Sequence, residues 1–500
     1  MGSAFSCPVA GPTQGIAATV TIRNLTVTPL ELKLAERLDH ENYLSKITSR
    51  ITGRRRPHEA GWTGEQQEEQ QLASARQDIT DITVPPFSEC PTSVHAPDLK
   101  RRHEQLRLTF EDPSTGHRYS AEIPGPSPRS IVLKPVASAS SEDPKEFTAI
   151  YLPSHSYLAL FSSANLSSWM STLPDHLPLS SLSIPGTHNS PTHHTALPSV
   201  RCQAVPVIDQ LNNGVRFLDV RVSCPQHPRT RPSLQLVHSA FPITINLFTA
   251  RSKSLSALLD TLYTFLAAHP TETLLLSLKR EGTGKGSDAD LSQILLRHYI
   301  DADRDKWYTS PAIPRLSECR GRIVLVRRFQ LHKPVRALGI DGSVWPDNAA
   351  DGMCRGGAIR IQDFYDVARS EDMERKLRYV QEGLERAAQM VHPLGAPSGG
   401  AKNGGGVART TKVQPLYINF LSASSFFNIS CWPDRIAVKL NPSTITYLCM
   451  EHGAPGKGPG KLTIGDAATG IVVTDWVGHK GDWDLMRCIV GWNARLQLGQ

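Results

Sequence analysis

The 500-residue sequence lacks the features that mark several large classes of protein. No apolar run approaches the roughly 18 residues that a membrane-spanning helix needs. The start of the chain has no charged-then-apolar secretory signal. The nine cysteines include no CxxC pair, so their spacing indicates neither a zinc site nor a redox motif. The glycine-rich segment 453–460 does not lead from a strand into a helix, which argues against a phosphate-binding loop.

What is present is typical of a globular protein with a mildly basic surface. Hydrophobic residues make up 39% and charged residues 20% of the chain, and the formal net charge is +7. A basic balance suits an anionic membrane surface or a phosphate-bearing substrate. The short basic clusters at 54–56 and 100–102 contain no interleaved aromatic residues, so we expect no nucleic-acid partner.

The first residues, 1–14, are expected to form a flexible N-terminus that can carry lipids. Residues 1–6 read MGSAFS, which matches the myristoylation pattern at Gly2, and Cys7 could take a second acyl chain. Two such anchors hold a protein at a membrane, whereas one is marginal. We therefore expect a cytoplasmic, peripheral membrane protein.

Residues 15–160 have the sequence pattern of a small β-domain. Short β-rich runs at 18–23, 106–110, 119–123, 131–135 and 147–152 are separated by Pro, Gly and Asp turns. This pattern predicts a β-sandwich-like accessory domain, interrupted by a polar, mobile insertion at 53–81. No chemical site assembles in it, so docking or regulation, with a partner that the sequence does not identify, is its expected role.

After about residue 165 the pattern becomes strand–helix alternation. Leucines and a phenylalanine at i, i+3, i+4 and i+7 predict a helix over 254–269, and Met373, Leu377, Val380 and Leu384 on one face predict a second over 371–390. Eight mostly apolar runs read as parallel strands buried on both faces, which predicts an irregular (β/α)8 TIM barrel. The eight runs are 182–184, 217–220, 234–237, 273–278, 323–326, 358–361, 416–420 and 470–474.

Polar or charged side chains follow nearly every one of these strands. In a TIM barrel the carboxyl ends of the strands share one face, where active sites lie. Two histidines in one cavity can act as base and acid in a displacement at phosphorus, and cations suit a phosphodiester. Those cations stand where a water-activating metal would need carboxylates, so we expect no metal and no cofactor. The strand-end residues are His188, Asn189, Asp219, Arg221, His238, Lys279, Arg328, Asp363, Tyr365 and Asp475.

Nine stretches, in order, resemble the X domain of phosphatidylinositol-specific phospholipase C in its bacterial-type, calcium-independent form. The resemblance covers about residues 165–490 and leaves the N-terminal third outside. It implies a lyase that produces diacylglycerol and a cyclic inositol phosphate, with phosphatidylinositol in membranes as its partner. The stretches are SIPGTHNS (183–190), GVRFLDVR (214–221), LQLVHS (234–239), TETLLLSLKRE (271–281), GRIVLVRRF (321–329), WPDN (345–348), IQDFY (361–365), LYINFLSASS (416–425) and GIVVTDW (470–476).

The resemblance also implies a role for each matching residue. His188 would be the general base that takes the proton of the inositol 2-hydroxyl, and Asp475 would orient it. Arg221 would bind the phosphate, and His238 would be the general acid for the departing diacylglycerol oxygen, with Asp219 in support. The inositol hydroxyls would contact Lys279, Arg328, Asp363 and Tyr365, with Trp345 on the pocket wall.

Asn189 is the clearest departure from the bacterial pattern, which has an aspartate that pairs with the acid histidine. Calcium-dependent relatives have a metal-binding asparagine there, but Arg221 and Lys279 stand where those relatives place acidic ligands, so we expect no calcium requirement. Two alternatives remain open: cleavage of glycosylated inositol lipids, and a catalytically weak lipid-binding or scaffold protein.

Overall fold

The computed structural model describes residues 18–39, 73–79, 82–98, 104–124, 130–137, 143–194, 199–226, 233–243, 253–333, 335–391, 414–425, 428–456 and 467–497. Gly2, Cys7 and most of the predicted insertion lie outside these residues. The chain forms two compact units. Unit 1 comprises residues 1–24, 28–145 and 149–160, and unit 2 comprises residues 25–27, 146–148 and 161–500.

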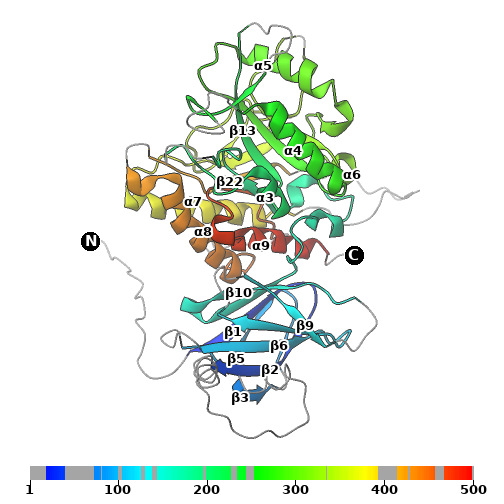
Figure 1. The fold of residues 1–500 in the computed structure, drawn as a ribbon, viewed down its shortest axis with the longest axis vertical. Helices are drawn as coiled ribbons and strands as arrows, with labels where there is room; N and C mark the ends of the chain where they lie inside the picture. The colour runs from blue at the N-terminus through cyan, green and yellow to red at the C-terminus, as the bar shows by residue number, and fades with distance from the viewer. Residues whose placement is uncertain are drawn as a thin grey trace, which may run out of the picture. The chain divides into compact units, whose positions relative to one another are not determined.

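Unit 1 consists of two sheets (Figure 1). The alternation of buried and partly exposed residues along β7, with Tyr119, Ala121 and Ile123 buried, shows why these segments form strands with one apolar face. One sheet has the order β5(Ser88–His95), β1(Thr19–Leu25), β11(Tyr157–Phe161), β10(Thr148–Leu152), β8(Ser130–Val132). The other has the order β3(Ala73–Asp78), β2(Leu30–Asp39), β6(Glu104–Glu111), β7(Arg118–Ile123), β9(Lys134–Ala137), and β4(Thr83–Val84) also pairs with β2.

The prediction that 53–81 is wholly an insertion is wrong at its C-terminal end. β3 lies within it and pairs antiparallel with β2, from Leu34↔Asp78 to Leu38↔Ala73. β3 is an edge strand, and its sequence, ASARQD, has no apolar alternation from which a strand could be predicted.

Unit 2 contains a 12-stranded sheet whose central strands are parallel. Nearly every residue of these strands is buried, as expected for strands covered on both faces. The path runs β17(Trp307–Tyr308), β18(Ile323–Arg328), β16(Leu274–Arg280), β13(Phe217–Ser223), β12(Ile184–Thr187), β23(Ile471–Thr474), β22(Leu416–Phe420), β21(Ile359–Gln362), β20(Gly352–Met353). β19(Ile340–Asp341) also pairs with β18.

The parallel strands enclose one apolar core, which makes the unit TIM-barrel-like. Ile184, Phe217, Val324, Ile359 and Ile418 come from five different strands and belong to one buried cluster. Figure 1 shows α7, α8 and α9 together on one side of the sheet, and α7 packs on β21 and β22. The helices are α3(Val207–Asn212), α4(Leu255–Ala268), α5(Asp288–Leu295), α6(Leu316–Cys319), α7(Ser370–Ala388), α8(Pro433–Met450) and α9(Asp484–Gly491).

The third predicted barrel strand is wrong in its role. β14(Gln235–His238) is a strand, but it pairs antiparallel with the end of β13 and with β15(Phe241–Pro242). β13 therefore pairs directly with β16 in the parallel sheet. His238 still reaches the same end of the sheet, because β14 folds back from the C-terminal end of β13. Within the residues that the structure describes, no helix is both long and apolar enough to cross a membrane.

Candidate active site

A cavity of about 550 Å³ opens at the carboxyl ends of the parallel strands. Eight of the eleven predicted site residues line it, and they come from segments spread over nearly 180 residues of the chain. The other three, Asn189, Asp219 and Asp475, are buried beside it, each at most 2% exposed. The fold thus brings the whole predicted set together. The lining members are His188, Arg221, His238, Lys279, Arg328, Trp345, Asp363 and Tyr365.

His188 and Asp475 meet because β12 and β23 are paired in register. Thr187 pairs with Thr474, so the next residue on each strand emerges at the same level. The Nδ1 atom of His188 lies 2.9 Å from Oδ1 of Asp475. This carboxylate can only accept a hydrogen bond, so it holds the proton of the imidazole on Nδ1.

The other ring nitrogen of His188 faces two donors. Arg221 Nη2 lies 3.0 Å and Asn189 Nδ2 lies 3.1 Å from His188 Nε2. A guanidinium cannot accept a hydrogen bond, so Nε2 accepts and the ring in this arrangement is neutral. Burial alone would lower the pKa of His188, but the charges of Asp475 and Cys202 outweigh it and raise that pKa to about 10. The geometry favours the neutral ring as long as Arg221 donates to it.

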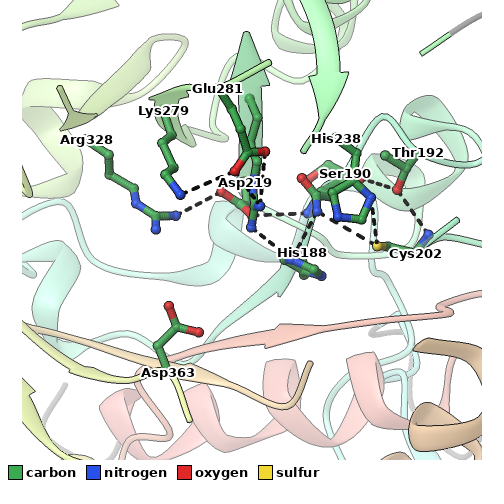
Figure 2. A network of polar contacts seen from close by, with 12 residues as sticks. His188, Ser190, Thr192, Cys202, Asp219, His238, Lys279, Glu281, Arg328 and Asp363 are labelled. Carbon is green, nitrogen blue, oxygen red and sulfur yellow. Dashed lines mark hydrogen bonds and ion pairs between the residues drawn. The ribbon is translucent and has the colours of Figure 1, made fainter. Parts of the chain in front are cut away.

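Arg221 is held by two carboxylates. Its Nη1 lies 3.1 and 3.2 Å from the two oxygens of Glu281, and its Nη2 lies 3.4 Å from Asp219 Oδ2. Burial would raise the pKa of Asp219, yet Arg221 and Arg328 overcome burial and hold it below its ordinary value. Lys279 contributes a further cation, with its Nζ 3.3 Å from Glu281. Figure 2 shows this charge network beside His188 and His238.

His238 lies on the opposite side of the network from Lys279 and Arg328 in Figure 2. Its Nδ1 lies 2.6 Å from the carbonyl oxygen of Val200, which can only accept, so Nδ1 is protonated and Nε2 is the position that can donate or take a proton for catalysis. The ring centroids of His188 and His238 are 6.1 Å apart and the rings are nearly perpendicular. Both rings line the same cavity.

The remaining predicted residues form the far wall of the cavity. The guanidinium of Arg328 lies 3.8 Å from the ring centroid of Trp345, and its Nη1 donates to Asp219 Oδ1 at 3.2 Å. Trp345 in turn donates to Asp363 at 2.9 Å. Figure 2 draws Asp363 apart from the charge network, which has its own carboxylates in Asp219 and Glu281.

Tyr365 stands at the edge of the cavity and is 40% exposed. Its hydroxyl donates to Asp347 at 2.9 Å. Burial and this acidic neighbour raise the pKa of Tyr365 to about 12, so the hydroxyl stays protonated. Because its proton is directed to Asp347, the phenol oxygen is left to accept from a ligand.

Asn189 does not contact His238 in the part of the chain that the structure describes. Its backbone has a φ of 42°, a left-handed conformation that asparagine tolerates better than most residues. Its backbone N–H donates to Asp219 at 3.2 Å, and its side chain turns to His188. The carbonyl of Val200 thus takes the place at Nδ1 of His238 where the resemblance would put a carboxylate.

Sequence reasoning missed two residues of this site. Glu281 lines the cavity and binds both Arg221 and Lys279. Its position two residues after Lys279 puts it on the same side of the chain, so the period-2 alternation could have identified it. Cys202 is fully buried with its Sγ 3.9 Å from His238 Nδ1, and it follows no strand, so no local pattern indicated it.

Three side chains of the site are of types that can bind a metal ion. One ligand atom each from His188, Cys202 and Asp475 lies within 4.8 Å of the others.

Comparison with known proteins agrees with this fold. The family model described as the phosphatidylinositol-specific phospholipase C X domain matches residues 176–329. A 1-phosphatidylinositol phosphodiesterase of Listeria monocytogenes is 31% identical over 186 residues, which are 35% of this chain and 52% of that protein. The chain thus spans about half the length of this relative. A 1-phosphatidylinositol phosphodiesterase of Staphylococcus aureus is 26% identical over 324 residues, covering 62% of this chain and 88% of that protein.

A solved phosphatidylinositol-specific phospholipase C from Staphylococcus aureus shares the fold, with a TM-score of 0.50, 21% identity, and coverage of 66% of this chain and 98% of that chain. Unit 2 therefore belongs to the class of TIM-barrel-like α/β domains. Within that class, the segment that matches the X-domain model of phosphatidylinositol-specific phospholipase C is residues 176–329. The resemblance found in the nine sequence stretches is confirmed.

Proposed function

We propose that this chain is a phosphatidylinositol diacylglycerol-lyase, a phospholipase C that needs no metal cofactor. The observation that carries the proposal is the placement of His188, with Asp475 behind it, across from His238, with Arg221 beside the space between them. A base, an acid and a fixed cation around one cavity are the parts that an internal displacement at a phosphodiester requires.

The base step begins when the phosphate binds Arg221. A phosphate oxygen accepts from the guanidinium and draws it away from His188 Nε2, which then accepts the proton of the inositol 2-hydroxyl. Asp475 keeps the Nδ1 proton in place and stabilises the imidazolium that forms. The 2-oxygen attacks phosphorus, so the new P–O bond closes a five-membered cyclic phosphate.

The acid step completes the exchange. The bond from phosphorus to the diacylglycerol oxygen breaks, and that oxygen takes a proton from Nε2 of His238. Val200 holds the other nitrogen of this ring at 2.6 Å and so fixes its direction. One proton enters at His188 and one leaves from His238, so the products are diacylglycerol and cyclic inositol phosphate, and the two histidines return to their starting states through solvent.

The other residues that line the cavity would bind the inositol ring. Lys279 and Arg328 supply donors, Asp363 supplies acceptors, and Tyr365 supplies a phenol at the cavity edge. Glu281 adds an acceptor that already spans Arg221 and Lys279. Trp345 holds Arg328 and Asp363 in place through ring stacking and one hydrogen bond.

The proposal extends to the organisation of the chain. Residues 165–490 are an irregular TIM-barrel catalytic domain, and residues 15–160 are a β-sandwich-like accessory domain. Acylation at Gly2 and Cys7 would hold the protein on the cytoplasmic surface of a membrane, where phosphatidylinositol is present. Substituting Gly2→Ala should release the protein from membrane fractions of cells that express it, and unchanged fractionation would reject this anchor.

The test uses the full chain and vesicles that contain phosphatidylinositol, in the presence of chelator, with release of diacylglycerol as the readout. We expect release from phosphatidylinositol and none from phosphatidylcholine. An analogue that lacks the inositol 2-hydroxyl should not be cleaved, because it has no internal nucleophile. Cleavage of that analogue would reject the lyase mechanism, and lack of release from phosphatidylinositol at any pH would reject the function.

A further inference from the structure

Three metal-ligating side chains converge behind the cavity. The three side chains lie on separate segments of the chain and belong to His188, Cys202 and Asp475. One donor atom from each lies within 4.8 Å of the other two. Cys202 is fully buried and Asp475 is 2% exposed, while His188 lines the cavity and so gives access from it. The set combines sulfur, nitrogen and oxygen donors.

The surroundings of this cluster leave polar atoms without partners. Oδ2 of Asp475 and Oδ1 of Asn189 are buried, and neither has a hydrogen-bond partner in the described part of the chain. A buried acceptor without a partner destabilises the folded protein, and a bound cation would relieve that destabilisation. Asn189 is 1% exposed, so water in the open cavity does not reach it freely.

The thiol of Cys202 is also suited to bind a metal. Its Sγ lies 3.9 Å from Nδ2 of Asn189 and 3.9 Å from Nδ1 of His238, so the sulfur is next to the polar groups of the site. Thiolate is the form that ligates metals, so binding would release the thiol proton.

We propose that His188, Cys202 and Asp475 form an inhibitory zinc site. Zinc takes cysteine, histidine and carboxylate ligands in four-coordinate geometry, whereas calcium and magnesium select oxygen ligands only. Three protein ligands leave one position for water. The ion would bind both the ring of His188 and its partner Asp475, so the base could no longer accept the proton of the 2-hydroxyl. Zinc here blocks the reaction and is not a cofactor.

Metal binding can be measured without any enzyme assay, so it stands apart from the proposed function. Cobalt(II) is titrated into the full chain, and the near-ultraviolet band that arises when cobalt binds thiolate is recorded. We expect this band to saturate at one equivalent for the wild type and for Cys431→Ser, a buried cysteine elsewhere in unit 2. Cys202→Ser should lack it. A band of equal size in Cys202→Ser would overturn the site.

A second variant guards against misfolding of Cys202→Ser, which thermal unfolding would reveal. Asp475→Asn keeps the thiol and the shape of the side chain but loses one anionic ligand. It should weaken cobalt binding at least tenfold while keeping the thiolate band at saturation. Binding as tight as that of the wild type would exclude Asp475 as a ligand and overturn the three-residue site.

The inhibitory effect rests on the proposed function and is tested separately. Zinc is titrated into the phosphatidylinositol assay, and each variant is compared with its own rate in chelator. The wild type and Cys431→Ser should lose activity and recover it with chelator, whereas Cys202→Ser should need at least tenfold more zinc. Equal sensitivity of Cys202→Ser would overturn the inhibition. A wild type that binds cobalt but never cleaves the lipid would reject the function and leave the metal site standing.

Discussion

Two arginines, one just before β13 and one near its end, make different kinds of contact. Arg216, just before the strand, is fully buried and pairs with Glu272 at 2.9 Å, while its other nitrogens donate to four backbone carbonyls. Arg221, near the end of the strand, lies on the cavity, and its Nε has no partner among the described residues. Its other two guanidinium nitrogens contact His188 and Glu281.

The difference indicates that the start of β13 contributes to stability and that its end contributes to the cavity. At the start of β13 all three guanidinium nitrogens of Arg216 donate to Glu272 or to backbone carbonyls, so none is left to bind a ligand. At the ends of β13 and β16, the cations are held by carboxylates but remain open to the cavity. A substrate phosphate can therefore exchange places with a carboxylate or an imidazole at low cost. Variants at the two ends should separate loss of rate from loss of stability.

The largest expected effect is loss of the base. His188→Gln keeps a polar side chain but cannot accept a proton, so the rate should fall by at least about 10⁴-fold, as for removal of other catalytic bases. The variant's melting temperature should stay within a few degrees of that of the wild type, because His188 lines the cavity rather than the core. A rate within tenfold of the wild-type rate would reject the base assignment.

Asp475→Asn should lower the rate by about 10²–10⁴-fold, because the amide no longer holds the correct tautomer. It should also move the pH profile. Asp475 raises the pKa of His188, so its removal lowers that pKa, and the base becomes deprotonated at lower pH. The acidic limb of kcat/KM should therefore shift to lower pH. An acidic limb that stays in place would show that Asp475 does not act through His188.

The two ends of β13 are compared most directly by Arg221→Met and Glu272→Gln. The first removes the cation at the phosphate and should cost about 10²–10³-fold in rate with a small change in unfolding free energy. The second leaves Arg216 buried without its counter-charge and should cost about 3–5 kcal/mol of stability. Activity of folded Glu272→Gln should remain near wild type. If the two variants lost rate and stability in the same proportion, the proposed division between the two ends would be wrong.

Calcium should have the smallest effect. The carboxylates of Asp219 and Glu281 are already engaged by arginine and lysine, so they offer no free anionic shell for an added ion. Excess calcium added to metal-stripped protein should change the rate on phosphatidylinositol by less than about twofold. Activation of tenfold or more would contradict the expected absence of a calcium requirement.

Much of this site could be predicted because it follows simple periodicity. His188, Asp219, Arg221 and Asp475 come at or just after strand ends, and parallel strands deliver such residues to one face. His238 was predicted at the cavity for the wrong reason, since β14 is antiparallel and returns from the end of β13. The pairing of a strand depends on long-range contacts that a local apolar run does not specify.

Other features of the structure could not be predicted from the local sequence. Cys202 reaches the histidines through a connecting segment, and its neighbours in the sequence do not show what lies across the cavity. β2, whose ten residues include five charged side chains, was missed because its pattern is mixed, yet it pairs along most of its length with β6. In both cases the tertiary context, rather than residue preference, decides the outcome.

The most direct test of the central claim follows the phosphorus itself. Phosphatidylinositol vesicles are treated with the full chain in chelator, and the water-soluble products are observed over time by ³¹P NMR. The arrangement of His188, Arg221 and His238 predicts that five-membered cyclic inositol phosphate appears first and that any acyclic inositol phosphate forms later from it. Acyclic inositol phosphate as the first product, formed without a cyclic precursor, would contradict the account.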